Sequence, residues 1–358
     1  MIRLYAHMSA SFRTVSEGLK EAFEDLGVLS GYVVGEQQEF DSEKLDGALA
    51  PVAVVVGDPM RVLMAHLQGD HKEIWLMLAP NSEGIPVRFK QELTAVRGGR
   101  PTVTGFLAPS SWAKFILEQE FPDYPVKLCR HGVLKAFQMN RTWRQEAWNH
   151  LRKDAVNFVA LHVASAVARK GTGELVQAWQ KLKAAKKIEG MLLISCNPRF
   201  AAEFEALAPQ DSSIRVVHGQ TWDTQTYSRL LQQHVHLVIQ PSRAEGFGLV
   251  PLEARACGVP VAMSVNTGHL DQLVGVGVEV VLIKSGPSEE SDDYWGATAP
   301  TVSEKDVEES LLRAYEQIDT RIEQAILSAD ETRNAWTWAQ GALEVVDHWK
   351  KKYQPEGV

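Results

Sequence analysis

Glu245 and Glu253 flank a glycine-containing loop, and these residue types at this spacing are the part of the chain best suited to chemistry. The apolar residues 236–239 predict a buried strand, and residues 249–257 predict a helix that begins directly after the loop. Backbone N–H groups at a helix N-terminus stabilise phosphate, and glycine lets a ligand approach the backbone closely. The order of strand, loop and helix therefore predicts an anion site with a carboxylate on either side of it.

The two carboxylates restrict the kind of anion that such a site can bind. A carboxylate close to a phosphate is repelled unless it bonds hydroxyl groups or cations. A ligand that is anionic in its middle and rich in hydroxyl groups at both ends would satisfy both glutamates. A sugar nucleotide has this chemistry, and we expect one to bind here.

Residues 241–261 resemble the signature of the retaining GT-B glycosyltransferases of family GT4, the glycosyl transferases group 1. In that family two glutamates with seven residues between them straddle the donor sugar and the nucleotide ribose, and Glu245 and Glu253 have this spacing. Further motifs follow the order of the family, at residues 109–114, 131–137, 169–178 and 267–270. The resemblance implies an α/β GT-B fold, with two Rossmann-like domains facing across a cleft. It also implies metal-independent, retaining transfer of a sugar from a nucleoside diphosphate, with no cofactor.

The resemblance places the donor mainly on the C-terminal domain. It implies that Glu245 holds the sugar hydroxyls and the developing positive charge, that Glu253 holds the ribose, and that Lys170 stabilises the departing diphosphate. Relatives often carry a second cation shortly before this lysine. Ser165 stands there in this chain, so Arg169 or a residue of the N-terminal domain would replace that cation. The expected donor-binding residues, with His218 beside the base, are Ser165, Arg169, Lys170, His218, Gly246, Phe247, Gly248, Leu249, Val250 and Glu253.

Basic residues gather in the middle of a chain whose net charge is −8. Between residues 86 and 153, twelve Lys or Arg stand against five Asp or Glu. This asymmetry predicts an anionic acceptor such as a phosphorylated small molecule, a lipid or DNA, and the alternative is a set of solvated helix faces. The expected acceptor-side residues are Glu83, Arg97, Arg100, Arg141 and Arg144. Glu83 and His131 are also candidate catalytic groups, although packing at the domain junction explains His131 equally well.

Apolar strands alternate with helical patterns, which predicts two Rossmann-like domains. Residues 1–137 form the expected acceptor-side domain and residues 138–335 the expected nucleotide-sugar domain. The polar segment 139–154 is expected to carry the linker between them. Residues 336–358 are amphipathic, and in GT-B proteins such a terminal helix packs back on the first domain. The polar segment 285–299 is expected to be a mobile surface loop.

Composition describes a soluble globular protein, with 45% hydrophobic and 23% charged residues. No apolar run reaches the length of a membrane span, and we expect a cytoplasmic protein. The three cysteines are widely separated and lack metal-ligand spacing, so we expect reduced thiols and no bound metal.

Three alternatives remain open at the level of the sequence. The basic stretch also suits a transferase that modifies a hydroxylated DNA base. A sugar-nucleotide epimerase or a phosphorylase shares the fold, and a silent binding module is the third alternative. The sequence leaves the donor base open, with UDP- and GDP-sugars both considered, and it leaves the acceptor and the oligomeric state open as well.

Overall fold

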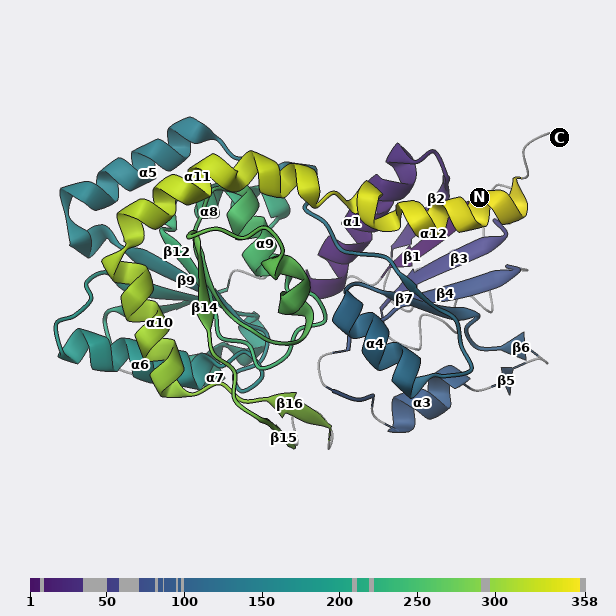
Figure 1. The fold of residues 1–358 in the computed structure, drawn as a ribbon, viewed down its shortest axis with the longest axis horizontal. Helices are drawn as coiled ribbons and strands as arrows, with labels where there is room; N and C mark the ends of the chain where they lie inside the picture. Colours follow the sequence, from purple (N-terminus) through teal and green to yellow (C-terminus); the bar gives the residue numbers. More distant parts are fainter. Residues whose placement is uncertain are drawn as a thin grey trace. The chain divides into compact units, whose positions relative to one another are not determined.

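The computed structural model describes residues 1–6, 10–34, 50–57, 71–80, 83–85, 87–94, 96–97, 100–207, 211–218, 222–290 and 297–354 (Figure 1). The chain divides into two compact units: unit 1 comprises Met1–Leu134 and Trp336–Val358, and unit 2 comprises Lys135–Ala335. The division falls after Leu134, whereas the sequence analysis placed it after residue 137. The short helix η2 (Lys135–Phe137) packs on unit 2, where the Ser228 hydroxyl donates to the Ala136 carbonyl at 2.9 Å.

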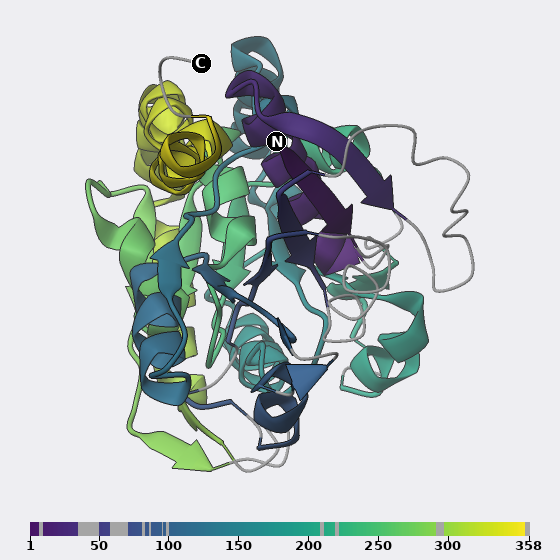
Figure 2. The same cartoon turned by 90° about the vertical axis from the view of Figure 1, so that its right-hand side faces the viewer.

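Unit 1 is built on a parallel six-stranded sheet in the order β2-β1-β3-β4-β7-β8. Its strands β1 and β2 lie side by side in Figure 2. Every residue of β1, β3 and β4 is buried, as expected for apolar strands in a sheet covered on both faces. The bounds are β1 (Ile2–Ala6), β2 (Leu29–Val34), β3 (Val52–Val56), β4 (Glu73–Met77), β7 (Gly105–Ala108) and β8 (Val126–Leu128).

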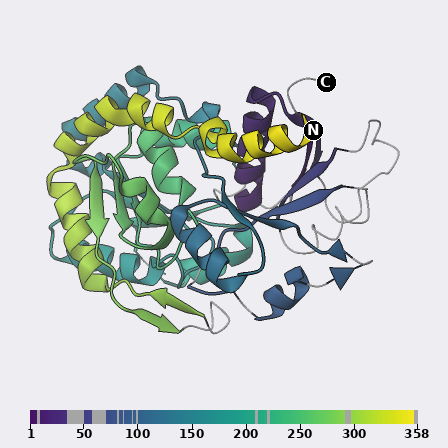
Figure 3. The same ribbon diagram turned by 45° about the vertical axis from the view of Figure 1, so that its right-hand side comes forward.

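The helices of unit 1 are α1 (Ala10–Asp25), α3 (Val87–Thr94), α4 (Ser111–Glu120) and α12 (Trp338–Tyr353), and a short ladder pairs β5 (Val96–Arg97) with β6 (Arg100–Pro101). The C-terminal helix α12 lies beside α1, as Figures 1 and 3 show. Glu73 fixes its far end, because that buried carboxylate accepts hydrogen bonds from Lys352 and from the Tyr353 hydroxyl. The last helix of the sequence therefore belongs to the first unit.

Unit 2 repeats the architecture with a parallel sheet in the order β11-β10-β9-β12-β13-β14. Its strands are β9 (Val159–Val163), β10 (Met191–Ser195), β11 (Ile214–Val217), β12 (Leu237–Gln240), β13 (Val261–Ser264) and β14 (Val280–Ile283). Its helices are α5 (Arg141–Lys153), α6 (Thr172–Ala184), α7 (Ala201–Glu205), α8 (Thr224–His234), α9 (Leu249–Ala256), α10 (Glu304–Glu316) and α11 (Ile318–Ala335). β9 and β12 are neighbours at the centre of this sheet, so the loops that follow them meet at one edge.

The core of unit 2 fixes these two strands. Trp179 of α6 is fully buried in the same apolar cluster as Ala160 of β9 and Ile239 of β12. In the same unit α10 packs on α6, α11 packs on α9, and α5 packs on α8. The site-bearing loops thus rise from a packed, rigid layer.

Two expectations for unit 2 are wrong. Residues 139–154 are not a linker, because most of them form α5, which buries Ala147 and Leu151 in unit 2. Part of the expected mobile loop is regular, since β15 (Ser288–Glu290) pairs antiparallel with β16 (Thr298–Pro300). Residues 291–296 of that loop lie outside the described residues.

Candidate functional site

The loop between β12 and α9 carries Glu245 and ends at Gly248, the N-cap residue of α9. Gly248 has φ +87°, in the left-handed region, and a Cβ there would lie 2.3 Å from the His269 ring. Glycine is therefore required for its backbone conformation and for the space that His269 occupies. No side chain caps α9, so its first N–H groups stay available to an anionic ligand.

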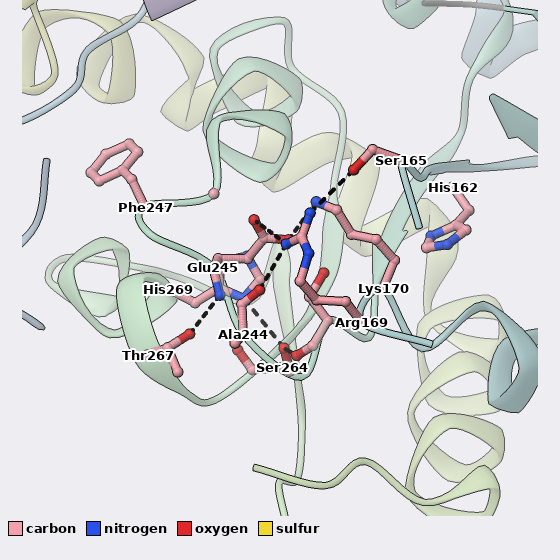
Figure 4. A network of polar contacts seen from close by, with 12 residues as sticks. His162, Ser165, Arg169, Lys170, Ala244, Glu245, Phe247, Ser264, Thr267 and His269 are labelled. Carbon is pink, nitrogen blue, oxygen red and sulfur yellow. Dashed lines mark hydrogen bonds and ion pairs between the residues drawn. The ribbon is translucent and has the colours of Figure 1, made fainter. Parts of the chain in front are cut away.

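A second turn, which begins at Thr267, holds the Glu245 loop in place (Figure 4). The backbone N–H of Glu245 donates to the Thr267 hydroxyl at 2.9 Å, and the N–H of Gly268 donates to the Glu245 carbonyl at 2.8 Å. A Cβ on Gly268 would lie 2.5 Å from backbone atoms of Gly246, so the two turns are in direct contact. The orientation of Glu245 is thereby set by residues that follow β13.

Two cations from the loop between β9 and α6 converge on the Glu245 carboxylate (Figure 4). Lys170 Nζ lies 2.5 Å from Glu245 Oε1, and Arg169 Nη1 lies 3.5 Å from Oε2. The Arg169 guanidinium also donates to the Ser165 hydroxyl at 3.1 Å and to the Ala244 carbonyl at 3.0 Å. The three charged side chains are 11–15% exposed. Together they carry one excess positive charge, a suitable environment for an anion.

The two glutamates of the signature have opposite electrostatic surroundings. Burial alone would raise the pKa of Glu245, but the charges of Lys170 and Arg169 hold it well below its usual range. Glu253 is 5% exposed, and burial is the one cause of its pKa shift, with no compensating charge from a neighbour. Burial therefore raises the pKa of Glu253 to about 8. The two signature glutamates therefore have pKa values shifted in opposite directions.

Three residues that the donor-site prediction omitted support the same loops. His162 of β9 bonds the Ile239 carbonyl and the Thr172 hydroxyl, each at 2.9 Å, and burial lowers its pKa to about 4. The Gln272 amide donates to the carbonyls of Phe247 and Gly248 at 2.8 and 2.6 Å. His269 is fully buried beside Gly248. The motif at residues 267–270 was a signal for His269, but no local pattern points to His162 or Gln272.

The acceptor-side prediction is wrong for Arg144. Its side chain is completely buried in unit 2 and donates to the carbonyls of Gly258, Leu231, Gln232 and Val235 at 2.8–3.3 Å. Arg144 therefore joins α5 to the end of α8 and to the turn after α9. Arg141, one turn earlier on α5, is exposed and pairs with Asp330 at 3.2 Å.

The remaining predicted residues are His218 in unit 2 and Glu83, Arg97, Arg100 and His131 in unit 1. His218 is exposed directly after β11, and Glu83 is exposed in the short described stretch 83–85. Arg97 and Arg100 face each other across the β5–β6 ladder, and their side chains lie outside the described part of the structure. His131 is buried against the Trp338 ring, with ring centroids 4.9 Å apart, and burial lowers its pKa to about 3.

The described ranges lack two kinds of structural feature. No helix there combines the length and apolar character needed to cross a membrane. No group of three or more His, Cys, Asp or Glu side chains there could hold a metal ion.

Comparison with known proteins bears on both units. Residues 144–294 match the family model described as glycosyl transferases group 1. Over 48 residues the chain is 52% identical to D-inositol 3-phosphate glycosyltransferase 1 of Catenulispora acidiphila, which is 13% of this chain and 11% of that protein. This chain thus matches only a small part of that relative's length.

Solved structures resemble the whole chain. Sucrose-phosphate synthase from Thermosynechococcus elongatus has a TM-score of 0.69 at 14% identity, over 98% of each chain. Alr3699/HepE of Anabaena in complex with UDP and glucose has a TM-score of 0.66 at 13% identity, over 98% of this chain and 100% of that chain. At such identities the likeness shows the fold, and it confirms the α/β GT-B fold predicted from the sequence.

Proposed function

We propose, on the premise that residues 144–294 belong to the glycosyl transferases group 1 family, that this chain transfers a sugar from a nucleoside diphosphate sugar to an acceptor with retention of configuration. The observation that carries the proposal is the convergence of Lys170 and Arg169 on Glu245, next to the uncapped end of α9. These groups supply two cations, free N–H donors and a carboxylate at one place. Departure of a nucleoside diphosphate from a sugar needs this combination.

Each group has a distinct part in the proposed reaction. The diphosphate binds the first N–H groups of α9 and draws Lys170 and Arg169 away from Glu245, because it carries the larger negative charge. Glu245 is then free to hold the sugar hydroxyls and to face the positive charge that develops at the anomeric carbon. Glu253 lies further along the same helix and holds the ribose. As the bond to the anomeric carbon breaks, the two cations and the helix N-terminus stabilise the leaving diphosphate.

The proposed reaction needs no metal ion, because Lys170 and Arg169 neutralise most of the charge of a diphosphate. Arg169 takes the place of the second cation that the family often carries. Its guanidinium reaches back to the Ser165 hydroxyl, at the position where that cation is expected. UDP-sugars are the first donors to test, because the similar Anabaena protein was solved with UDP and glucose.

We propose a phosphorylated small molecule as the acceptor. The basic stretch of residues 86–153 supports an anionic acceptor, and the named activity of the Catenulispora relative acts on an inositol phosphate. Arg97, Arg100 and Arg141 are the residues proposed to meet it, and Arg144 is excluded by its burial. A plot of the logarithm of the acceptor KM against the logarithm of the salt concentration should have a slope of about one or two. If DNA were the acceptor, the slope would be close to the number of phosphates contacted. The three buried free cysteines fit the cytoplasm, where we propose that the protein acts.

Nucleotide binding in the presence of chelator tests the function directly. Thermal unfolding is measured with UDP, GDP and ADP, each with EDTA and with Mg²⁺. A bound nucleoside diphosphate at a hundred times its Kd should stabilise the protein by about 2.7 kcal/mol. Stabilisation in EDTA equal to that in Mg²⁺ is expected. Stabilisation seen only with Mg²⁺ would contradict metal independence, and no stabilisation by any nucleotide would contradict the function itself.

A further inference from the structure

Two loops at one edge of the unit 2 sheet carry the charged groups of the site, and they touch at several points. Gly171, the N-cap residue of α6, has φ +64°, and a Cβ there would lie 2.2 Å from the Pro241 carbonyl oxygen. The Arg243 N–H donates to the Arg169 carbonyl at 2.9 Å. The loop between β9 and α6 therefore lies directly on the loop between β12 and α9.

The Arg243 side chain adds an ion pair to this contact. Its Nη2 lies 2.9 Å from Oε1 of Glu174, in the first turn of α6. The two side chains are 25% and 21% exposed, so solvent screens their attraction only in part. Arg243 is thus bonded at two points, by its backbone to the loop before α6 and by its side chain to the helix itself.

The other ion pairs between the two loops differ from this pair in one respect. Lys170 and Arg169 are paired with Glu245 in the unliganded protein, and the proposed reaction needs both cations at the diphosphate instead. Their pairing with Glu245 is therefore given up when the donor binds. Arg243 and Glu174 have no part at the donor in that reaction, so their pair can hold the two loops together throughout it.

We propose that the Arg243–Glu174 ion pair is a positioning device, which fixes the spacing between the cations before α6 and the N–H groups at the start of α9. The inference rests on the proposed function, because a donor diphosphate bound there bridges the two loops. Neither side chain touches the diphosphate, and each acts through the loop or helix that it holds. Loops that have the right spacing before binding lose less entropy when the ligand bridges them, so the pair should contribute to affinity.

Calorimetric titration of the full chain with UDP, GDP and ADP tests this role in Arg243→Met, Glu174→Gln and the double variant. Either single substitution should weaken binding of the preferred nucleotide about three- to tenfold, and the double variant should bind no more weakly than the single variants. Arg243→Lys keeps a cation opposite Glu174 and should retain most of the affinity. Melting temperatures without ligand should differ little, because the pair is partly exposed.

The signs of the two single effects separate positioning from a direct electrostatic role. If each residue acted only through its charge on the bound anion, Arg243→Met would weaken binding and Glu174→Gln would strengthen it. Such opposite effects would overturn the proposal. Wild-type affinity in both single variants, or losses that add in the double variant, would overturn it as well.

Glu189→Gln is the matched control. Glu189 and Lys183 form an ion pair of the same length, 2.9 Å, at the other end of α6. Nucleotide affinity of this variant should equal that of wild type. Failure of wild type to bind any of the three nucleotides would instead reject the proposed function, so the two failures are distinguishable.

Discussion

Lys170 Nζ lies 2.5 Å from Glu245 Oε1, and the two residues are 75 positions apart in the sequence. Both side chains are only 11% exposed. The lysine that is expected to hold the diphosphate is thus paired with the carboxylate that is expected to hold the sugar. In the unliganded protein each residue neutralises the charge of the other. A bound donor must therefore replace both partners, with its diphosphate at Lys170 and its sugar hydroxyls at Glu245.

The first prediction follows from this competition. Glu245→Gln removes the charge that holds Lys170 and Arg169, so UDP should bind as tightly as to wild type or up to about tenfold more tightly. Turnover should fall by a hundredfold or more, because the carboxylate acts mainly in the transition state. Calorimetry and single-turnover sugar transfer measure the two effects.

Glu308→Gln is a suitable control for this substitution. It also breaks a carboxylate–lysine pair, between Glu308 and Lys181, at the surface of unit 2. Affinity and turnover should both stay at wild-type values. Weaker UDP binding in Glu245→Gln would mean that the carboxylate helps to hold the nucleotide and does not compete with it.

The second prediction concerns Glu253 and pH. Its pKa is about 8 in the folded protein and about 4.3 when unfolded, so the folded state binds the proton more tightly. The stability contributed by this group is fully present below about pH 4 and is lost as pH rises to about 8. Relative to Glu253→Gln, the wild-type free energy of unfolding should fall by up to about 1.4 kcal/mol per pH unit across this window. Urea unfolding of both proteins at pH 5, 6, 7, 8 and 9 measures this difference in the free energy of unfolding. A difference that stays the same at every pH would show that Glu253 is ionised in the folded protein across this range.

The third prediction isolates the hydroxyl of Thr267. Thr267→Val keeps the β-branched shape at φ +45° but removes the acceptor of the Glu245 N–H. We expect a loss of stability of about 1–3 kcal/mol and a lower turnover, because a buried N–H is left unpaired and the catalytic loop is released. Thr267→Ser keeps the hydroxyl and should retain most of both. Equal behaviour of the two variants in urea unfolding would argue that this hydrogen bond contributes nothing.

The fourth prediction separates two arginines that lie one turn apart on α5. Arg144→Met removes hydrogen bonds to four carbonyls in a buried site, so the free energy of unfolding should fall by roughly 2–4 kcal/mol. Arg141→Glu breaks an exposed pair and should change stability by less than about 1 kcal/mol. Denaturant unfolding checks both values. A rise in acceptor KM for Arg144→Met without loss of stability would return Arg144 to the acceptor side.

The sequence alone determined the local parts of the site. An apolar run, a turn and a helical period follow one another within one short stretch and predict a strand, a glycine loop and a helix. The structure has the strand at Leu237–Gln240 and the helix at Leu249–Ala256, with the loop between them. The same local rules misread α5 as a linker. The buried face of α5 includes Arg144. A charged residue at a buried position interrupts the apolar periodicity from which a helix is predicted.

Only the tertiary structure decided which groups meet and what charge they carry. Lys170 and Glu245 come together because β9 and β12, far apart in sequence, are neighbours in a parallel sheet. Burial without a partner raises the pKa of Glu253, whereas burial beside two cations lowers that of Glu245. Two identical side chains in one motif thus acquire opposite pKa shifts, because solvation and Coulomb energies depend on neighbours brought together from distant parts of the chain.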